Sequence, residues 1–401
     1  MTGWEKPPQV PLGDICELQI GRTPSRAEPR YWGPGHPWLS IADMNQGRDL
    51  FTTKETITDA AVDECNCRPV RAGTVVMSFK LSVGKVGIIG RSMFTNEAIV
   101  ALRLRQPSEM DVAYMYHALR ALDFSGVGER AAKGITLNRQ SLAGLHVPVP
   151  PYTEQRRIGV LLDKADGIRR KQRESRRALD EFLQSAYLAL VGRRSRDYLR
   201  WPELRLAELA SSDPGSMRTG PFGSALKHSE FVDSGVAVLG IDNAVQNRFA
   251  WVERRFIPNA KYERFKRYTV KPGDVIVTIM GTTGRSAVVP DNIPLAISTK
   301  HLAVITVDRS KTGPQFLSHA IHCDPIILAQ ISAANRGAIM AGLNLGIIKH
   351  LRIRVPPLSV QARFDEVVKQ VSAVRERLDE SEREGNQLID SVKHRAFQGV
   401  L

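Results

Sequence analysis

The sequence predicts an α+β protein: two mixed α/β domains separated by two long antiparallel coiled-coil helices, arranged as a pseudo-two-fold internal repeat. Three observations support this fold class: a segment that occurs twice at a constant offset, a heptad pattern after each copy, and short β-rich runs at matching places. At 401 residues the chain exceeds the roughly 100 to 200 residues of one domain. We therefore expect a first domain over residues 1–150, a first long helix over 151–192, a second domain over 193–355 and a second long helix over 356–401.

The duplication is clearest around two proline pairs. Residues 149–155 (VPPYTEQ) recur as residues 355–361 (VPPLSVQ), an offset of 206. The same offset pairs further residues upstream, namely Arg130 with Arg336, Leu137 with Leu343, Asn138 with Asn344, Leu142 with Ile348 and Leu145 with Leu351. A repeat of this length indicates that one structural unit is present twice.

A heptad pattern follows each proline pair. In the first copy the seam falls on Ile158, Leu161, Ala165, Ile168, Gln172, Ser175, Leu179, Phe182, Ala186 and Ala189; in the second it falls on Phe364, Val367, Val371, Val374, Leu378, Ser381, Gly385, Leu388, Val392 and Arg395. Proline cannot continue a helix from upstream, so we expect each helix to begin there, capped by Thr153 or Ser359. The first helix is expected to end near Gly192. About 36 residues correspond to about 54 Å, which is too long for an ordinary core helix.

The order of these segments along the chain sets their directions. The first helix leads from the first domain to the second, so a second helix that pairs with it must run back, and the two are antiparallel. Two equivalent units placed in this way are related by a pseudo-two-fold axis, as in a dimer within one chain.

The charge balance points to a polyanionic partner. Lys and Arg number 56 against 42 Asp and Glu, which gives a net charge of +14 and a pI near 9.8. Such a surface attracts nucleic acid, with anionic lipid as the rival. The chain contains no run of about 18 apolar residues, and its start lacks the layout of a signal peptide, so we expect a cytoplasmic protein without a membrane partner. Four scattered cysteines predict neither a disulfide framework nor a metal site.

The two halves share a frame but differ in their loops. The β-rich run at residues 73–78 corresponds to 273–278, and each leads to a small-residue loop, at 82–87 and 281–287, that can approach a phosphate closely. The openings differ: GRTPSR at residues 21–26 and YWGPGHPW at 31–38 in the first half, TGPFGSALK at 219–227 in the second. This pattern suits two domains that bind the same kind of ligand and read different versions of it.

These openings, together with the VPP segment and long helix that close each half, resemble the specificity subunits of type I restriction-modification systems over essentially the whole chain. The resemblance implies a non-catalytic, sequence-specific DNA-binding subunit with two target-recognition domains, each reading one half of a bipartite, asymmetric site in double-stranded DNA. It also implies partners: two methyltransferase subunits that modify adenine, and motor-nuclease subunits. S-adenosylmethionine, ATP and Mg²⁺ are then expected on those partners, and no cofactor on this chain.

Catalytic motifs do not fit the residues. An adenine methyltransferase loop needs a polar residue before Pro-Pro to accept a hydrogen bond from the target amino group, and here Val149 and Val355 occupy that place. Residues 84–90 read GxxGxxG rather than a dinucleotide fingerprint, and residues 281–286 lack the lysine and spacing of a Walker loop. We therefore predict no catalytic residue and no metal ligand in this chain.

DNA contacts are expected from loop residues that can reach phosphates or base edges. The candidates in the first half are Arg22, Thr23, Ser25, Arg26, Lys80, Lys85, Arg130 and Lys133, and those in the second are Arg218, Thr219, Ser224, Lys227, Thr282, Arg285, Lys300 and Arg336. Arg130 and Arg336 occupy equivalent places, so we assign them phosphate or structural work. The basic run at residues 169–177 is interpreted as an exposed helix face that can also meet DNA or a partner subunit.

One alternative from a different functional class stays open. It is a basic coiled-coil scaffold that binds protein or RNA partners without preference for a duplex sequence. Divergent loops on a repeated frame argue against it, since a scaffold has no need of two differing loop sets.

Overall fold

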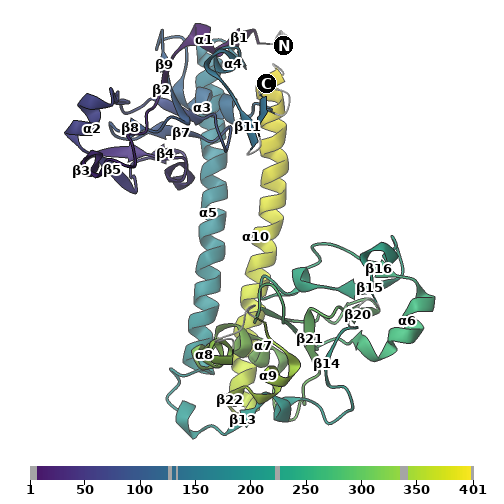
Figure 1. Ribbon diagram of the computed structural model, residues 1–401. Coiled ribbons are helices and arrows are strands. Elements are labelled where there is room, and N and C mark those ends of the chain that lie inside the picture. Colours follow the sequence, from purple (N-terminus) through teal and green to yellow (C-terminus); the bar gives the residue numbers. More distant parts are fainter. Residues whose placement is uncertain (1–6, 125–128, 132–133, 222–225, 335–341, 399–401) are drawn as a thin grey trace. The chain divides into compact units, whose positions relative to one another are not determined.

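The computed structural model describes residues 7–124, 129–131, 134–221, 226–334 and 342–398 (Figure 1). The chain forms two compact units. Unit 1 comprises Met1–Arg173 and Glu380–Leu401, and unit 2 comprises Glu174–Asp379. Each unit therefore contains one globular part and a portion of both long helices.

The globular part of unit 1 is built on a five-stranded sheet in the order β2-β9-β6-β7-β4. These strands are β2 (Cys16–Ile20), β9 (Ile99–Leu104), β6 (Val75–Ser78), β7 (Val86–Ile89) and β4 (Asp49–Leu50). A three-stranded sheet contains β5 (Glu55–Ile57), β3 (Trp32–Leu39) and β8 (Phe94–Thr95), and two strand pairs join β1 (Gln9–Pro11) to β12 (His146–Pro148) and β10 (Glu129–Ala131) to β11 (Gly134–Thr136). The short helices are α1 (Leu12–Ile15), α2 (Asp59–Glu64), α3 (Val112–Arg120) and α4 (Arg139–Ala143).

The globular part of unit 2 is built on a four-stranded sheet in the order β14-β21-β18-β19. Its strands are β14 (Met217–Thr219), β21 (Leu302–Ile305), β18 (Val275–Thr278) and β19 (Ser286–Val288). A second sheet orders β16 (Phe256–Ile257), β15 (Val236–Leu239), β20 (Ala296–Ser298) and β17 (Thr269–Val270), and β13 (Glu203–Arg205) pairs with β22 (Arg352–Arg354). The short helices are α6 (Asn259–Phe265), α7 (Pro314–Cys323), α8 (Pro325–Ala334) and α9 (Leu345–His350).

The central strands are buried on both faces, which explains their nearly continuous apolar sequences. On β6, Val75 and Met77 join the core that includes α3, whereas Val76 joins a second core on the other side of the sheet. On β18, Val275 and Ile276 divide between two cores in the same way. Successive side chains of a strand point to opposite faces, so each of these four-residue strands packs side chains into two cores, one on each face of the sheet.

The predicted mixed α+β repeat is confirmed at the level of strand pairing. In unit 1, β9 lies antiparallel between β2 and β6, and in unit 2, β21 lies antiparallel between β14 and β18. The second sheets also agree, because β3 pairs antiparallel with β5 and parallel with β8, as β15 does with β16 and β20. Two segments with different loop sequences thus form one topology.

The long helices are α5 (Tyr152–Leu190) and α10 (Leu358–Gln398) (Figure 1). Both begin one residue before the predicted caps, so Thr153 and Ser359 lie within the first turn rather than at its cap. A buried glutamine in the next turn supports each start instead. Gln155 donates to the carbonyl oxygens of Pro150 and Glu109 at 2.9 Å and accepts from the Asp111 amide at 2.9 Å.

Gln361 has the same role at the start of α10. It donates to the Pro356 carbonyl oxygen at 2.8 Å and accepts from the Gly313 amide at 2.7 Å. Each glutamine therefore ties the start of a long helix to the loop before α3 or α7. None of the helices in the described part of the chain combines the length and apolar character needed to cross a bilayer.

The heptad seam is confirmed in part. Ile158, Phe364 and Val371 are buried as predicted, whereas Leu161, Ile168, Phe182, Val374 and Leu388 are exposed. The apolar positions buried in addition are Leu162, Leu183, Tyr187, Leu188, Val368 and Ile389. The reason is that the outer portions of the helices pack against the globular parts, as Ile158 and Leu162 do in the core of α3, so their buried face does not follow a two-helix seam.

Polar bonds join the helices where the heptad pattern weakens. In unit 1, Arg169 Nε donates to Asn386 Oδ1 at 2.9 Å. In unit 2, Arg375 forms an ion pair with Asp180, and Arg176 Nη2 lies 2.6 Å from Asp379 Oδ1. Gln172 Nε2 also donates to Ser381 Oγ at 3.4 Å in unit 1, so the partner residue numbers fall as the α5 numbers rise in both units, and the helices run antiparallel within each unit. These contacts also correct one interpretation of the basic run: Arg169 and Arg176 bridge the two helices.

The remaining basic residues of that run, Arg170, Lys171, Arg173 and Arg177, are exposed. Arg169 and Arg375 are separated by the repeat offset of 206, so each long helix contributes an equivalent arginine to the other. The repeat therefore extends to the polar contacts between the helices.

A histidine is buried on α7, in the core of unit 2. His319 Nδ1 donates to the Gln315 carbonyl oxygen at 2.8 Å, and its ring meets the ring of Phe364 edge-on, with centroids 5.0 Å apart. Burial lowers the pKa of His319 to about 4. The neutral ring is therefore the form that the fold accommodates.

We predict that Gln155→Ala destabilises unit 1 by about 3 kcal/mol, because it leaves buried amide and carbonyl groups without partners. The measurement is urea denaturation of the full chain, with Gln140→Ala on the exposed face of α4 as the matched control. Equal unfolding midpoints for the two variants would contradict the role given to Gln155.

We predict that the wild-type chain loses stability as the pH falls from about 6.5 to about 4, because in this range His319 is protonated in the unfolded state and stays neutral in the folded state. Neutral His319 contributes about 3 kcal/mol to the free energy of unfolding, and this contribution is fully present above pH 6.5. His319→Gln should reduce the dependence of Tm on pH in this window without abolishing it, because burial also lowers the pKa of His322 to about 4, whereas His350→Gln on exposed α9 should leave the dependence unchanged. A His319→Gln curve parallel to the wild type would rule this explanation out.

Candidate nucleic-acid interface

Strand register brings three loops of unit 1 to one edge of its central sheet. Ile20, the last residue of β2, lies opposite Val100, and Ser78, the last residue of β6, lies opposite Ile99 at the start of β9. The chain therefore leaves β2 and β6 and enters β9 at the same place. We call residues 21–26, 79–85 and 96–98 the loop edge of unit 1.

The register of unit 2 produces the same arrangement. Thr219 at the end of β14 lies opposite Ala303, and Thr278 at the end of β18 lies opposite Leu302 at the start of β21. We call residues 220, 221, 226, 227, 279–285 and 299–301 the loop edge of unit 2. Most residues proposed from sequence to contact DNA lie on these two edges, although they come from distant parts of the chain.

The turn after β6 and the turn after β18 share two closing hydrogen bonds. The Gly84 amide donates to the Ser78 carbonyl oxygen at 2.9 Å, as the Gly284 amide does to that of Thr278 at 2.9 Å. The next amide, of Lys85 or Arg285, donates to the hydroxyl of Ser78 or Thr278 at 3.1 and 3.0 Å. A cation thus follows the turn at the same position in both units.

Both edges depend on a glycine next to the neighbouring strand connection. A Cβ on Gly21 would lie 2.2 Å from the Thr95 carbonyl oxygen, and one on Gly220 would lie 2.1 Å from that of Ser298. Backbone packed this closely leaves no room for a side chain. Gly21 and Gly220, in the two divergent opening sequences, are therefore required for the same reason: each lies against neighbouring backbone that excludes a side chain.

The loop edge of unit 1 borders a groove of about 820 Å³. Four predicted residues line it, Arg22, Thr23, Ser25 and Arg26. Sequence reasoning missed the other basic and amide side chains of the groove, which are Gln19, Asn66, Arg68 and Arg139. Arg139 directly follows the repeated Leu-Asn pair, a signal that could have found it, whereas Arg68 lies in no motif.

Arg26 is held in place by its neighbours in the same unit. Its Nη2 donates to Glu55 Oε2 at 2.8 Å, its Nη1 also pairs with Glu55, and its guanidinium lies 3.7 Å from the centroid of the Trp32 ring. The hydrogen bond that Arg26 donates to Glu55 raises the pKa of Arg26, and the same bond lowers the pKa of Glu55. Arg26 therefore fixes the position of the loop at residues 21–26, and both terminal nitrogens of its guanidinium are already paired with Glu55.

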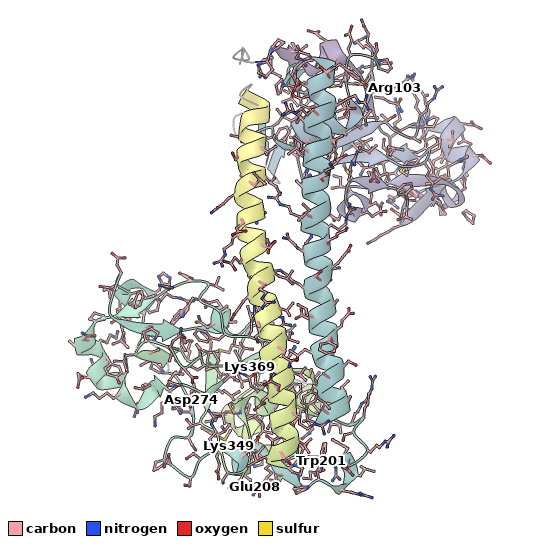
Figure 2. All side chains as sticks on the ribbon, turned by 180° about the vertical axis from the view of Figure 1, so that it is seen from behind. Arg103, Trp201, Glu208, Asp274, Lys349 and Lys369 are labelled. Atoms are coloured by element: carbon pink, nitrogen blue, oxygen red, sulfur yellow. The ribbon has the colours of Figure 1, made fainter. Side chains whose placement is uncertain are left out.

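The prediction of a DNA contact for Arg218 needs correction. Its side chain is only 12% exposed, and its Nη2 donates to Asp274 Oδ2 and to the Thr269 carbonyl oxygen, both at 2.6 Å. Its Nη1 donates to the Gly215 carbonyl oxygen and the Thr306 hydroxyl, both at 3.1 Å. With four donors used inside the sheet, Arg218 is a structural residue; Figure 2 labels its partner Asp274.

Among the other predicted residues whose side chains the structure describes, Thr23 has a buried hydroxyl oxygen, and the rest keep accessible or partly accessible side chains. Lys85 Nζ donates to Asn45 Oδ1 at 2.8 Å, and Lys80 Nζ lies 5.4 Å from the centroid of the Phe79 ring. The remaining accessible or partly accessible positions in unit 2 are Thr219, Lys227, Thr282, Arg285 and Lys300. Arg130 belongs to β10, but its side chain lies outside the described residues, as do Lys133, Ser224 and Arg336.

The two edges differ in charge at one equivalent position. Ile99 and Leu302 are equivalent because they lie opposite Ser78 and Thr278. Glu97 precedes Ile99 by two residues, as Lys300 precedes Leu302, so Glu97 and Lys300 occupy the same position in the two units. The same frame thus presents a carboxylate in one unit and an ammonium in the other. Within the described residues, no group of three or more His, Cys, Asp and Glu side chains could hold a metal ion.

Comparison with known proteins finds similarity to one group of proteins. The family described as type I restriction modification DNA specificity domain matches residues 1–175. The chain is 21% identical to the MjaIX specificity subunit of Methanocaldococcus jannaschii, over 89% of this chain and 85% of that one. It is 19% identical to the MjaVIII specificity subunit of the same organism, over 98% and 91% of the two chains.

A solved structure agrees in fold. The S subunit of a type I restriction-modification system from M. genitalium superposes with a TM-score of 0.57 at 14% identity, covering 98% of this chain and 96% of that chain. The family match over residues 1–175, the relatives aligned along most of the chain and the repeated fold agree: the chain is similar to the specificity subunits of type I restriction-modification systems.

Proposed function

We propose that this chain is the non-catalytic DNA-recognition subunit of a type I restriction-modification complex. In this proposal each unit reads one half of a bipartite, asymmetric site in double-stranded DNA through its loop edge. One observation supports it above others: the same strand register and the same turn occur twice, and they present different side chains. A shared frame provides a shared mode of DNA approach, and the differing side chains provide two half-site sequences.

The side chains at the two edges divide the work between phosphates and bases. Lys85 and Arg285 follow the same turn in each unit, so we assign them the sequence-independent task of holding phosphate. Glu97 and Lys300 occupy one position with opposite charge, so we assign them to discrimination between half-sites. A carboxylate accepts from the cytosine amino group, whereas an ammonium donates to guanine.

The chemistry belongs to partners in this proposal. Two adenine methyltransferase subunits and motor-nuclease subunits assemble with the chain in the cytoplasm and carry S-adenosylmethionine, ATP and Mg²⁺. Similarity to type I specificity subunits supports these partners. The chain itself selects where they act.

We predict one gapped, two-part methylation motif when the chain is coexpressed with its cognate methyltransferase. Exchange of residues 11–150 for the same region of another specificity subunit should change only one part of the motif. The measurement is genome-wide mapping of methylated adenines. Scattered or absent methylation, or steep salt dependence without sequence preference, would instead support the basic scaffold.

We predict that Lys85→Ala and Arg285→Ala each weaken DNA binding by roughly three- to tenfold at 0.15 M salt and reduce the slope of log K against log salt by about 1. The loss should be similar for cognate and altered sites, because phosphate contacts carry no sequence information. Fluorescence anisotropy with labelled duplexes at several salt concentrations measures both quantities.

Matched controls lie in the same units away from the loop edges. Arg103, at the far end of β9 beside Leu104, and Lys349 on α9 are exposed cations, and both are labelled in Figure 2. Arg103→Ala and Lys349→Ala should leave the salt slope unchanged. Equal slopes for all four variants would remove the loop edges from the interface.

A further inference from the structure

Leu81 is exposed at the tip of the turn that follows β6. Its side chain is 62% accessible to solvent, although leucine gains free energy from burial. The Ser82 amide donates to the Lys80 carbonyl oxygen at 2.7 Å, so the chain reverses over three residues with Leu81 at the centre. The side chain therefore projects from the outermost point of the turn.

The backbone of Leu81 is strained. Its φ is +65°, a conformation in which the side chain of an L-residue crowds the following carbonyl group. A bulky residue in this region is an outlier that persists only when the surrounding structure enforces it. Leu81 is thus unfavourable both in its conformation and in its exposure.

Unit 2 shows that the turn does not require leucine. Gly281 follows Thr278 by three residues, as Leu81 follows Ser78, and it adopts a φ of +71° without a side chain. Both turns close through the same bond to Gly84 or Gly284. Because glycine satisfies this backbone at no cost, the fold of unit 1 gives no reason for leucine at this position.

The neighbours of Leu81 identify the kind of surface it faces. Lys80 precedes it and Lys85 follows it by four residues, and the ammonium of Lys85 is positioned by Asn45 at 2.8 Å. Two cations beside one projecting apolar side chain suit a polyanion that also offers an apolar interior. Duplex DNA has both, with phosphates outside and stacked bases inside.

We infer that Leu81 is a wedge that inserts between adjacent base pairs of the first half-site and unstacks them, while Lys80 and Lys85 hold the flanking phosphates. Leucine carries no donor or acceptor, so it reads bases through apolar contact and through the deformability of the step it enters. This inference rests on the proposed function, because it requires that unit 1 binds duplex DNA.

The test uses the chain assembled with its methyltransferase, without methyl donor, on duplexes that carry the mapped motif. Adenines of the first half-site are replaced one at a time by 2-aminopurine, and thymines are probed with permanganate; both signals rise on unstacking. The methylated adenine is left out, because the methyltransferase unstacks that base itself. We expect a several-fold rise at one step of the wild-type complex.

Leu81→Gly should remove more than half of that rise and weaken binding by roughly three- to tenfold, while the Tm of the free chain stays equal or increases because the strain is relieved. Leu81→Met should keep the unstacking signal. The control is Phe51→Ala, which removes another exposed apolar side chain, 55% accessible to solvent. Phe51 follows β4, whose Leu50 lies opposite Ile89 at the end of β7 that is away from the loop edge. This variant should change neither the unstacking signal nor the affinity.

An undiminished unstacking signal with Leu81→Gly, or no unstacked step in the wild-type complex, overturns the wedge. A lower Tm for Leu81→Gly would show that the leucine serves the fold, which also overturns it. Failure of the wild-type complex to bind the motif is a separate result, because it contradicts the proposed function before any variant is compared.

Discussion

The structure depends on the antiparallel pairing of one central strand with two others, β9 between β2 and β6 in unit 1 and β21 between β14 and β18 in unit 2. This pairing places the ends of two strands and the start of the third at one edge of the sheet. A shift by one residue would exchange the side chains that β6 or β18 presents to the two cores, for example Val76 in place of Val75 and Met77, so the packing of both cores holds the register in place. The position of the loops is therefore a consequence of core packing.

Duplication separates what must stay the same from what can differ. The glutamines at the helix starts, the glycines that pass close to neighbouring backbone and the hydroxyls that accept from the turn occur in both units. The side chains that face outward differ, as Glu97 and Lys300 or Leu81 and Gly281 show. In physical terms, the interior fixes where a side chain is presented, and the surface is free to change which one it is.

Much of this organisation follows from the sequence, because repeats and strand runs are local patterns. The offsets of 206 and 200 predicted equivalent helices and equivalent turns, and the structure has both. Contacts between distant residues could not be predicted in this way: Arg218 finds Asp274 and Arg26 finds Glu55 only after the sheets have formed. The heptad pattern likewise missed Leu162, because that residue packs against a globular core rather than the other helix.

The central claim is that the loop edges are the surfaces that meet DNA, one on each half-site. Site-specific photocrosslinking tests it directly: a benzophenone side chain is placed at exposed Ser82 or Thr282, and at Arg103 or His350 as controls, in the assembled complex on its duplex. The account predicts crosslinks from position 82 to one half-site, from 282 to the other, and few from the controls. Crosslinks from both edges to the same half-site, or from the controls alone, would contradict it.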